Sequence, residues 1–137
     1  MIPTEIVTRW IDYMKDEGVG NVLILMDPDE YHVYEDPGLL NLYQADGLRC
    51  YIQSMQEPGA PRHVFQIIRD VQSRNEKLVA HCNAGRGRCG RVAAAWLVEE
   101  YGLTPERAME EVVCHARGCG AQRKNDVARL RAWLGHD

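Results

Sequence analysis

One stretch of the sequence decides both the fold and the chemistry of this chain: KLVAHCNAGRGRCGR, residues 77–91. It starts with a short apolar run at residues 78–80 that predicts a buried strand, and the apolar residues 92–97 that follow it predict a helix. Between the two lie cysteines, three glycines and three arginines. Glycines let backbone N–H groups turn inward, and the start of the helix adds the positive end of its dipole. The stretch therefore predicts a loop that binds an anion.

Two side chains of this loop carry chemistry. Cys82 lies at its base, where amide donors and a helix N-terminus favour the thiolate form of a cysteine. Arg88 follows six positions later and can fork two hydrogen bonds onto one phosphate group.

Two other interpretations of the loop have to be weighed. The glycine spacing of residues 85–90 also fits the dinucleotide-binding fingerprint, but the acidic residues at the required distance, Glu110 and Glu111, fall inside a helical pattern. Alternatively, Cys82 is an ordinary buried thiol and the arginines are a solvated helix start. That interpretation explains neither the glycines nor Arg88.

Composition narrows the class of protein. With 137 residues the chain is long enough for one core, so we expect a single domain over residues 1–137. A net charge of −4 argues against a nucleic-acid partner. No apolar run is long enough for stable membrane insertion, and the N-terminus does not resemble a signal peptide.

The cysteines indicate a compartment and argue against a metal. Five cysteines, an odd number without the spacing of a secreted scaffold, favour reduced thiols and a cytoplasmic location. Their spacing with His115 does not fit a zinc site, so we expect no metal.

The order of apolar patterns predicts an α/β fold. Strands are expected at residues 21–26, 48–55 and 78–80. Helices are expected at residues 4–17, 39–43, 64–71, 90–101, 104–113 and 127–134, with loops at 27–30, 56–61 and 117–120. Alternating strands and helices favour a parallel sheet, whose ligands bind at the carboxyl ends of the strands. The loops at 27–30, 56–61 and 82–88 are therefore expected to share one edge.

At this point the residues resemble a known family. The pattern His81-Cys82-x-x-Gly85-x-x-Arg88 resembles the signature of the cysteine-based protein tyrosine phosphatase superfamily, in particular the small dual-specificity phosphatase type. Residues 46–61 look like the family's stretch that runs through a strand to a mobile acid loop. The resemblance covers nearly the whole chain and implies a minimal dual-specificity-phosphatase-like fold, with a parallel or mixed sheet flanked by helices.

The resemblance also implies an activity: hydrolysis of phosphomonoesters through a phosphocysteine intermediate, without a cofactor. Cys82 would be the nucleophile, Arg88 would bind the phosphate oxygens, and His81 would help to hold the thiolate. The remaining loop positions would bind the substrate: Asn83, Ala84, Gly85, Arg86, Gly87 and Cys89.

Two positions depart from the family pattern. Glu57 stands where the family has an aspartate as general acid, and Asp27, Asp29 and Asp46 are weaker candidates for that task. Cys89 stands where the family has serine or threonine.

A thiol is a poorer donor than a hydroxyl, so the intermediate is expected to break down slowly, and a phosphate-binding pseudophosphatase is the alternative of another class. Cys89 could instead resolve an oxidised Cys82 as a reversible disulfide.

The substrate remains open between two classes. Arg86 resembles an extra basic residue of family members that act on phosphoinositides, inositol phosphates or phospholipid headgroups. The acidic residues within 27–36 argue against such polyanions. We therefore expect a protein tyrosine/dual-specificity phosphatase acting on a phosphorylated protein, with a small phosphorylated substrate as the alternative. The oligomeric state does not follow from the sequence.

Overall fold

The structure is a computed structural model that describes residues 1–83, 87–118 and 125–135. The chain divides into two compact units, Met1–Asn83 and Ala84–Asp137. The expectation of a single domain over residues 1–137 stays a prediction.

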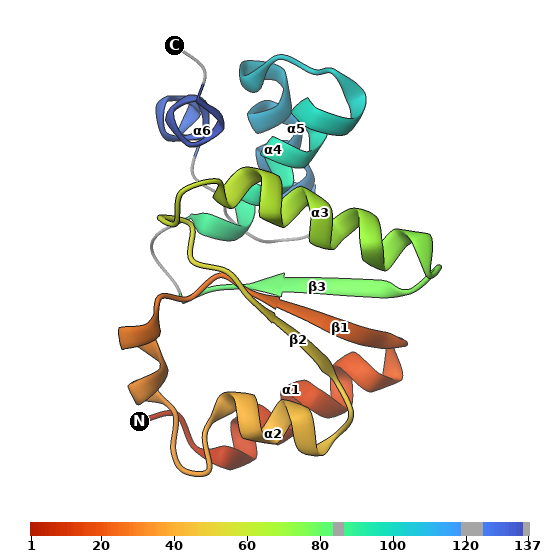
Figure 1. The fold of residues 1–137 in the computed structure, drawn as a ribbon, viewed down its shortest axis with the longest axis vertical. Coiled ribbons are helices and arrows are strands. Elements are labelled where there is room, and N and C mark those ends of the chain that lie inside the picture. The colour runs from red at the N-terminus through yellow and green to blue at the C-terminus, as the bar shows by residue number, and fades with distance from the viewer. Residues whose placement is uncertain (84–86, 119–124, 136–137) are drawn as a thin grey trace. The chain divides into compact units, whose positions relative to one another are not determined.

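The first unit is a three-stranded parallel sheet with helices on both faces. Its elements are α1 (Thr4–Asp16), β1 (Val19–Ile24), the 3-10 helix η1 (Pro28–Val33), α2 (Leu39–Ala45), β2 (Arg49–Ile52), α3 (Ala60–Ser73) and β3 (Lys77–His81). The strand order is β2-β1-β3, and both pairings are parallel. Figure 1 shows α1 and α2 on one face of the sheet and α3 on the other.

β1 lies in the centre of this sheet, which explains its sequence. A strand with neighbours on both edges and helices on both faces has no solvent-exposed side, so it is apolar at consecutive positions rather than at alternate ones. Val22, Ile24 and Met26 belong to the core that α1 and α2 cover, and all three are fully buried. Leu23 and Leu25 are equally buried.

The helices of this face supply the rest of that core. Val7, Ile11 and Met14 form the buried stripe of α1, at the spacing that brings side chains to one side of a helix. From α2, Leu39 and Tyr43 complete the cluster. The helix predicted at residues 4–17 is thus confirmed, and its buried stripe packs into the core.

The described part of the second unit is helical. It contains α4 (Arg88–Tyr101), α5 (Pro105–Gly118) and α6 (Val127–Leu134). As the sequence predicts, Thr104 caps α5: its Oγ1 accepts a hydrogen bond from the Arg107 amide at 3.2 Å. None of the described helices is long and apolar enough to cross a membrane.

The predicted α/β class and the parallel sheet are confirmed, while several boundaries differ. β1 begins two residues earlier than predicted and ends before Leu25. Residues 27–30, predicted as a loop, belong mostly to η1, because Asp27 and Glu30 cap its first turn. α3 begins at Ala60, because proline suits the first turn of a helix. α5 continues through the predicted loop to Gly118, and residues 119–120 lie outside the described part.

Candidate active site

The residues that follow the three strands of the first unit, as far as Asn83 after β3, lie at one edge of the sheet, as predicted. Beyond the last paired residues, the Leu25 amide donates to the His81 carbonyl at 2.9 Å. On the other side of β1, the Gln53 amide donates to the Ile24 carbonyl at 3.0 Å. These bonds extend the ladder up to the residue before Cys82. The backbone at the start of the loop that is predicted to bind an anion is therefore held by the sheet.

The His81 side chain is held by a chain of hydrogen bonds from two helices. Its Nε2 lies 2.9 Å from the hydroxyl of Tyr43, and this hydroxyl accepts from the Trp10 indole N–H at 3.0 Å. The Tyr43 and His81 rings also pack edge to face, with centroids 5.9 Å apart. Because Tyr43 is fully buried, the ring of His81 is oriented by a side chain of the hydrophobic core.

The order of donors assigns the proton on His81. An indole N–H can only donate, so the Tyr43 oxygen accepts from Trp10. Among the described residues, Nε2 of His81 is the other hydrogen-bond partner of this buried hydroxyl, so the Tyr43 O–H donates to Nε2. Nε2 is then the acceptor, and the neutral imidazole carries its proton on Nδ1.

Burial agrees with the neutral form. The His81 ring lines an apolar cavity of about 230 Å³ together with Ile2, Val7 and Leu39. Loss of hydration in such surroundings lowers the pKa of His81 to about 4. The same physical cause, burial, raises the pKa of Tyr43.

This assignment predicts a pH dependence of stability. Between pH 6.5 and about 4 the unfolded chain protonates His81 while the folded chain does not, so stability is lost as the pH falls through this window. At about 1.4 kcal/mol per pKa unit, we expect His81 to contribute about 3 kcal/mol to the decline in the free energy of unfolding between pH 7 and pH 4. Denaturant unfolding at several pH values measures it.

His81→Gln should remove that part of the decline, whereas His63→Gln, on the exposed side of α3, should keep it. Equal pH slopes for the wild type and His81→Gln would contradict the assignment.

Cys82 and Asn83 continue directly from β3 and are both half-buried. The Asn83 side chain donates through Nδ2 to Oε2 of Glu30 at 2.8 Å. The next three predicted binding residues, Ala84, Gly85 and Arg86, lie outside the described residues. Cys82 therefore lies between His81 and Asn83, and hydrogen bonds hold the side chains of both neighbours.

Glu57, the predicted general acid, lies exposed in the turn between β2 and α3. Its Oε2 accepts from Nε2 of the buried Gln53 at 3.2 Å. The turn is tied to the loop after β1, because Ser54 Oγ donates to Oδ1 of Asp27 at 2.6 Å. A backbone hydrogen bond also closes the turn itself, because the Ala60 amide donates to the Glu57 carbonyl at 3.0 Å. Glu57 is thus at the predicted edge, on a supported turn.

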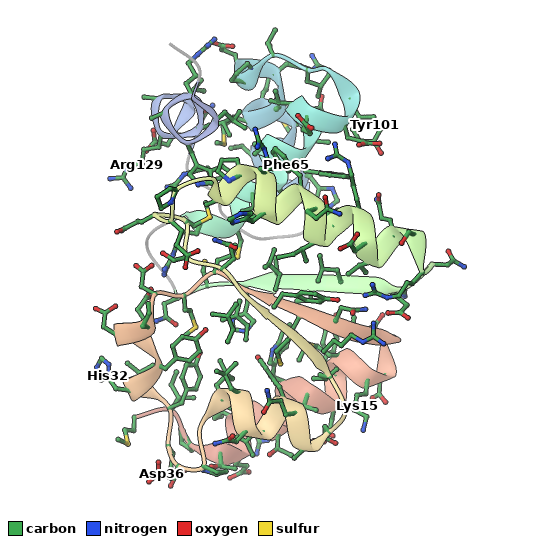
Figure 2. The ribbon with its side chains drawn as sticks, viewed as in Figure 1. Lys15, His32, Asp36, Phe65, Tyr101 and Arg129 are labelled. Carbon is green, nitrogen blue, oxygen red and sulfur yellow. The ribbon has the colours of Figure 1, made fainter. Side chains whose placement is uncertain are left out.

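One weaker acid candidate is at the wrong end of the sheet. Asp46 precedes β2, and its Oδ1 accepts from Nζ of Lys15 at 3.1 Å. In a parallel sheet the residue before a strand lies at the edge opposite to His81. Figure 2 agrees, with Lys15 on the side of the unit opposite to His32 of η1. The hypothesis that Asp46 is an acid of this site is therefore wrong, whereas Asp27 and Asp29 follow β1 at the predicted edge.

The second unit carries the other predicted loop residues at the start of α4. Gly87 precedes the helix with φ = 65°, a left-handed conformation that favours glycine. Arg88 and Cys89 form the first turn, and Arg88 is only 4% exposed. The helix therefore begins directly after the predicted loop, so its N-terminal amides follow the glycine-rich stretch.

Two further observations concern redox and metal chemistry. The described cysteines, Cys50, Cys82, Cys89 and Cys114, form no disulfide in this structure. The Cys82–Cys89 bridge was expected only under oxidising conditions and stays a prediction. Within the described ranges, no group of three or more histidine, cysteine or acidic residues could hold a metal ion.

Three supporting residues were not predicted from the sequence: Tyr43, Glu30 and Gln53. Tyr43 was predicted only as part of an apolar helix, since periodicity reports burial and not the partner of a hydroxyl. Gln53 fell within a predicted strand. Glu30 had a detectable signal, because an aspartate, a proline and a glutamate at positions 27, 28 and 30 have the spacing of a helix start.

Comparison with solved structures identifies the fold. Kinase associated phosphatase (KAP), with its catalytic-site cysteine replaced by serine, is similar with a TM-score of 0.71 and 23% identity, covering 93% of this chain and 76% of that chain. Human DUSP28 is similar with a TM-score of 0.55 and 16% identity, covering 89% and 78%. The fold is that of the small dual-specificity phosphatases.

The sequence comparisons give the family. A family model described as "Polymorphic toxin system, DSP-PTPase phosphatase" matches residues 3–102, so the chain belongs to this family. The rat protein named cyclin-dependent kinase inhibitor 3 is 27% identical over 114 residues, which cover 79% of this chain and 53% of that protein. The tyrosine-protein phosphatase cdc-14 of Caenorhabditis elegans is 37% identical over 46 residues, covering 34% of this chain and 6% of that protein. The chain thus spans about half the length of the first of these relatives.

Proposed function

We propose that the chain hydrolyses phosphomonoesters through a phosphocysteine intermediate on Cys82, as a protein tyrosine/dual-specificity phosphatase. The observation that carries the proposal is the position of the His81-Cys82 pair at the carboxyl end of β3, in a chain of the DSP-PTPase family. A cysteine there starts a loop whose amides, with those at the start of α4, suit an anion.

In the first step the Cys82 thiolate attacks phosphorus, and the bond from phosphorus to the leaving oxygen breaks. Glu57 gives its proton to that oxygen, so that an alcohol or phenol departs. Arg88 and the loop amides bind the oxygens of the transferring phosphoryl group, where negative charge is concentrated.

In the second step water attacks phosphorus, the S–P bond breaks, and the Cys82 thiolate is restored. Glu57, now a carboxylate, takes the proton of the attacking water. Cys89 supports the departing sulfur less well than a hydroxyl would, because a thiol is a weak donor. This step is therefore the slower one.

The role of Glu57 has a specific signature. Glu57→Gln cannot donate a proton, so turnover of alkyl phosphates should fall by about 10²-fold or more, the usual scale of general acid catalysis. Aryl phosphates with good leaving groups should change by less than about fivefold, since their leaving oxygen needs little protonation. Comparing kcat/KM on the two substrate types measures the effect.

Glu17→Gln is the matched control: it removes the same charge at the end of α1, where residues precede β1 rather than follow it. If Glu57→Gln lowers kcat/KM equally on both substrate types, or on neither, Glu57 is not the general acid and is only an exposed charge in the loop.

The charges at the carboxyl edge support a phosphoprotein substrate over a polyanion. Asp29 and Glu57 are exposed there, and Asp27, which accepts from Ser54, is half-buried. Their field opposes a ligand with several phosphates but tolerates one phosphate surrounded by neutral or basic residues. We also propose a reducing, cytoplasmic environment, in which Cys82 stays reduced.

A panel of phosphopeptides and inositol phosphates, assayed for released inorganic phosphate, tests this function. The proposal expects turnover of phosphotyrosine and phosphoserine/threonine peptides and weaker turnover of inositol polyphosphates. A preference for inositol polyphosphates would overturn the substrate class. Phosphate binding without any turnover would overturn the enzyme proposal in favour of a phosphate-binding pseudophosphatase.

A further inference from the structure

Glu30 is a carboxylate in an unusual place: it lies on η1 and is only 8% exposed. Burying a charge is costly unless its oxygens accept hydrogen bonds. Here each oxygen has a donor. Oε1 accepts from the backbone amide of Asp27 at 2.8 Å, and Oε2 accepts from Nδ2 of Asn83, also at 2.8 Å. The two donors lie in loops that follow different strands, so the carboxylate bridges these loops.

The η1 end of this bridge is fixed locally. The Glu30 amide donates to the Asp27 carbonyl at 2.9 Å, while the Asp27 amide donates back to the Glu30 side chain. This reciprocal pairing fixes the direction of the carboxylate. Asp27 in turn accepts from Ser54. Glu30 is therefore a rigid acceptor and not a solvated side chain that meets Asn83 by chance.

The other end of the bridge is the first residue after Cys82. On the near side of Cys82, His81 is held through its carbonyl by Leu25 and through its ring by Tyr43. On the far side, Asn83 is held through its side chain by Glu30. Cys82 thus lies between two anchored neighbours, and the second anchor comes from η1.

We propose that Glu30 is a positioning residue for the loop that begins at Cys82: its carboxylate clamps the Asn83 side chain and so fixes the path of the chain immediately after the cysteine. The proposal rests on the function proposed above, because that path decides where the first loop amides point. Amides that are already aligned do not have to reorganise when charge develops on the phosphoryl group. Both carboxylate oxygens of Glu30 accept hydrogen bonds in a buried site, so its role is to hold the loop and not to transfer a proton.

A double-mutant cycle tests the clamp, with Glu30→Ala, Asn83→Ala and the double variant. Each single variant should lower kcat/KM by about tenfold or more, the scale of one charge-assisted hydrogen bond, with most of the loss in kcat. The double variant should lose no more than about twofold beyond the worse single one, because both remove the same contact. Glu30→Gln should recover much of the loss, since its amide keeps the shape and Asn83 can turn its own amide to pair with it.

Glu17→Gln is the matched control for charge. It removes one negative charge at the end of α1, where the side chain is exposed, and should change kcat/KM by less than about twofold. If Glu17→Gln lowers kcat/KM as much as Glu30→Ala does, or if the two alanine effects simply multiply, the clamp is wrong.

Unfolding temperatures of the same variants test the clamp independently of the proposed function. The clamp expects the double variant to unfold at the same temperature as Glu30→Ala, because the Asn83 contact is already lost there. Additive lowering of the unfolding temperature overturns the clamp even in a chain that turns over substrate. Absence of turnover in the wild type overturns the proposed function, and the unfolding temperatures then still decide the clamp.

Discussion

Replacing Cys82 by serine is expected to lower turnover of every phosphomonoester substrate by at least about 10⁴-fold, the scale seen when a covalent nucleophile is removed. A serine hydroxyl is not ionised near neutral pH, so it is a far weaker nucleophile than a thiolate. The loop amides and Arg88 are unchanged, so binding of inorganic phosphate should stay within about threefold of the wild type. Steady-state kinetics and calorimetric titration with phosphate measure the two quantities on the same preparation.

Cys114→Ser is the control for this prediction, since Cys114 is an exposed cysteine on α5. It should leave both turnover and phosphate binding unchanged. Turnover by Cys82→Ser near the wild-type rate would exclude a phosphocysteine on this residue. Loss of phosphate binding together with turnover would mean that the substitution had damaged the loop.

The second large effect is expected at Arg88. A guanidinium offers two parallel hydrogen bonds to a phosphoryl group and a charge that offsets the negative charge of the transition state. Arg88→Ala should therefore lower kcat/KM by about 10³-fold, and phosphate binding should weaken as well. Arg88→Lys keeps the charge but not the fork, so it should recover only part of the loss. Because Arg88 is 4% exposed, thermal unfolding has to show that each variant is folded.

Arg91→Ala provides the comparison for charge, since it removes the same charge from the same end of α4, one turn further on. We expect a change of less than about threefold. A loss as large as that of Arg88→Ala would indicate a general effect of positive charge at this helix end and would contradict a specific phosphate contact by Arg88.

The order of strands and helices was predictable because local sequence determines it. The apolar run at residues 21–26 predicted a strand buried on both faces, and β1 is the central strand of the sheet. From a parallel sheet it followed that the loops after the strands share one edge, which the contact of Ser54 with Asp27 confirms. The strand boundaries were less predictable, because they depend on where a neighbouring strand stops pairing and not on where the apolar residues stop.

The polar supports of the site could not be predicted in the same way. Tyr43 is 38 residues from His81, and Glu30 is 53 residues from Asn83. A hydrophobic pattern shows that such residues are buried, but it does not show which polar atom faces which. Only the fold brings these pairs together. The proposed catalytic residues of the loop could be predicted because the family signature places them close together in sequence. The residues that hold them in place are distant in sequence, so no local pattern identifies them.

In the proposed mechanism, phosphate passes through a covalent bond to Cys82. The most direct measurement is rapid acid quenching of the wild-type chain during turnover of an aryl phosphate, followed by mass spectrometry of the peptide that contains Cys82. We expect one phosphate on the Cys82 sulfur, formed within the first turnover and accumulating because the second step is slower. The same peptide from Cys82→Ser should carry none. Turnover that proceeds with no phosphate on Cys82 at any quench time, or with phosphate on another residue, would contradict the account.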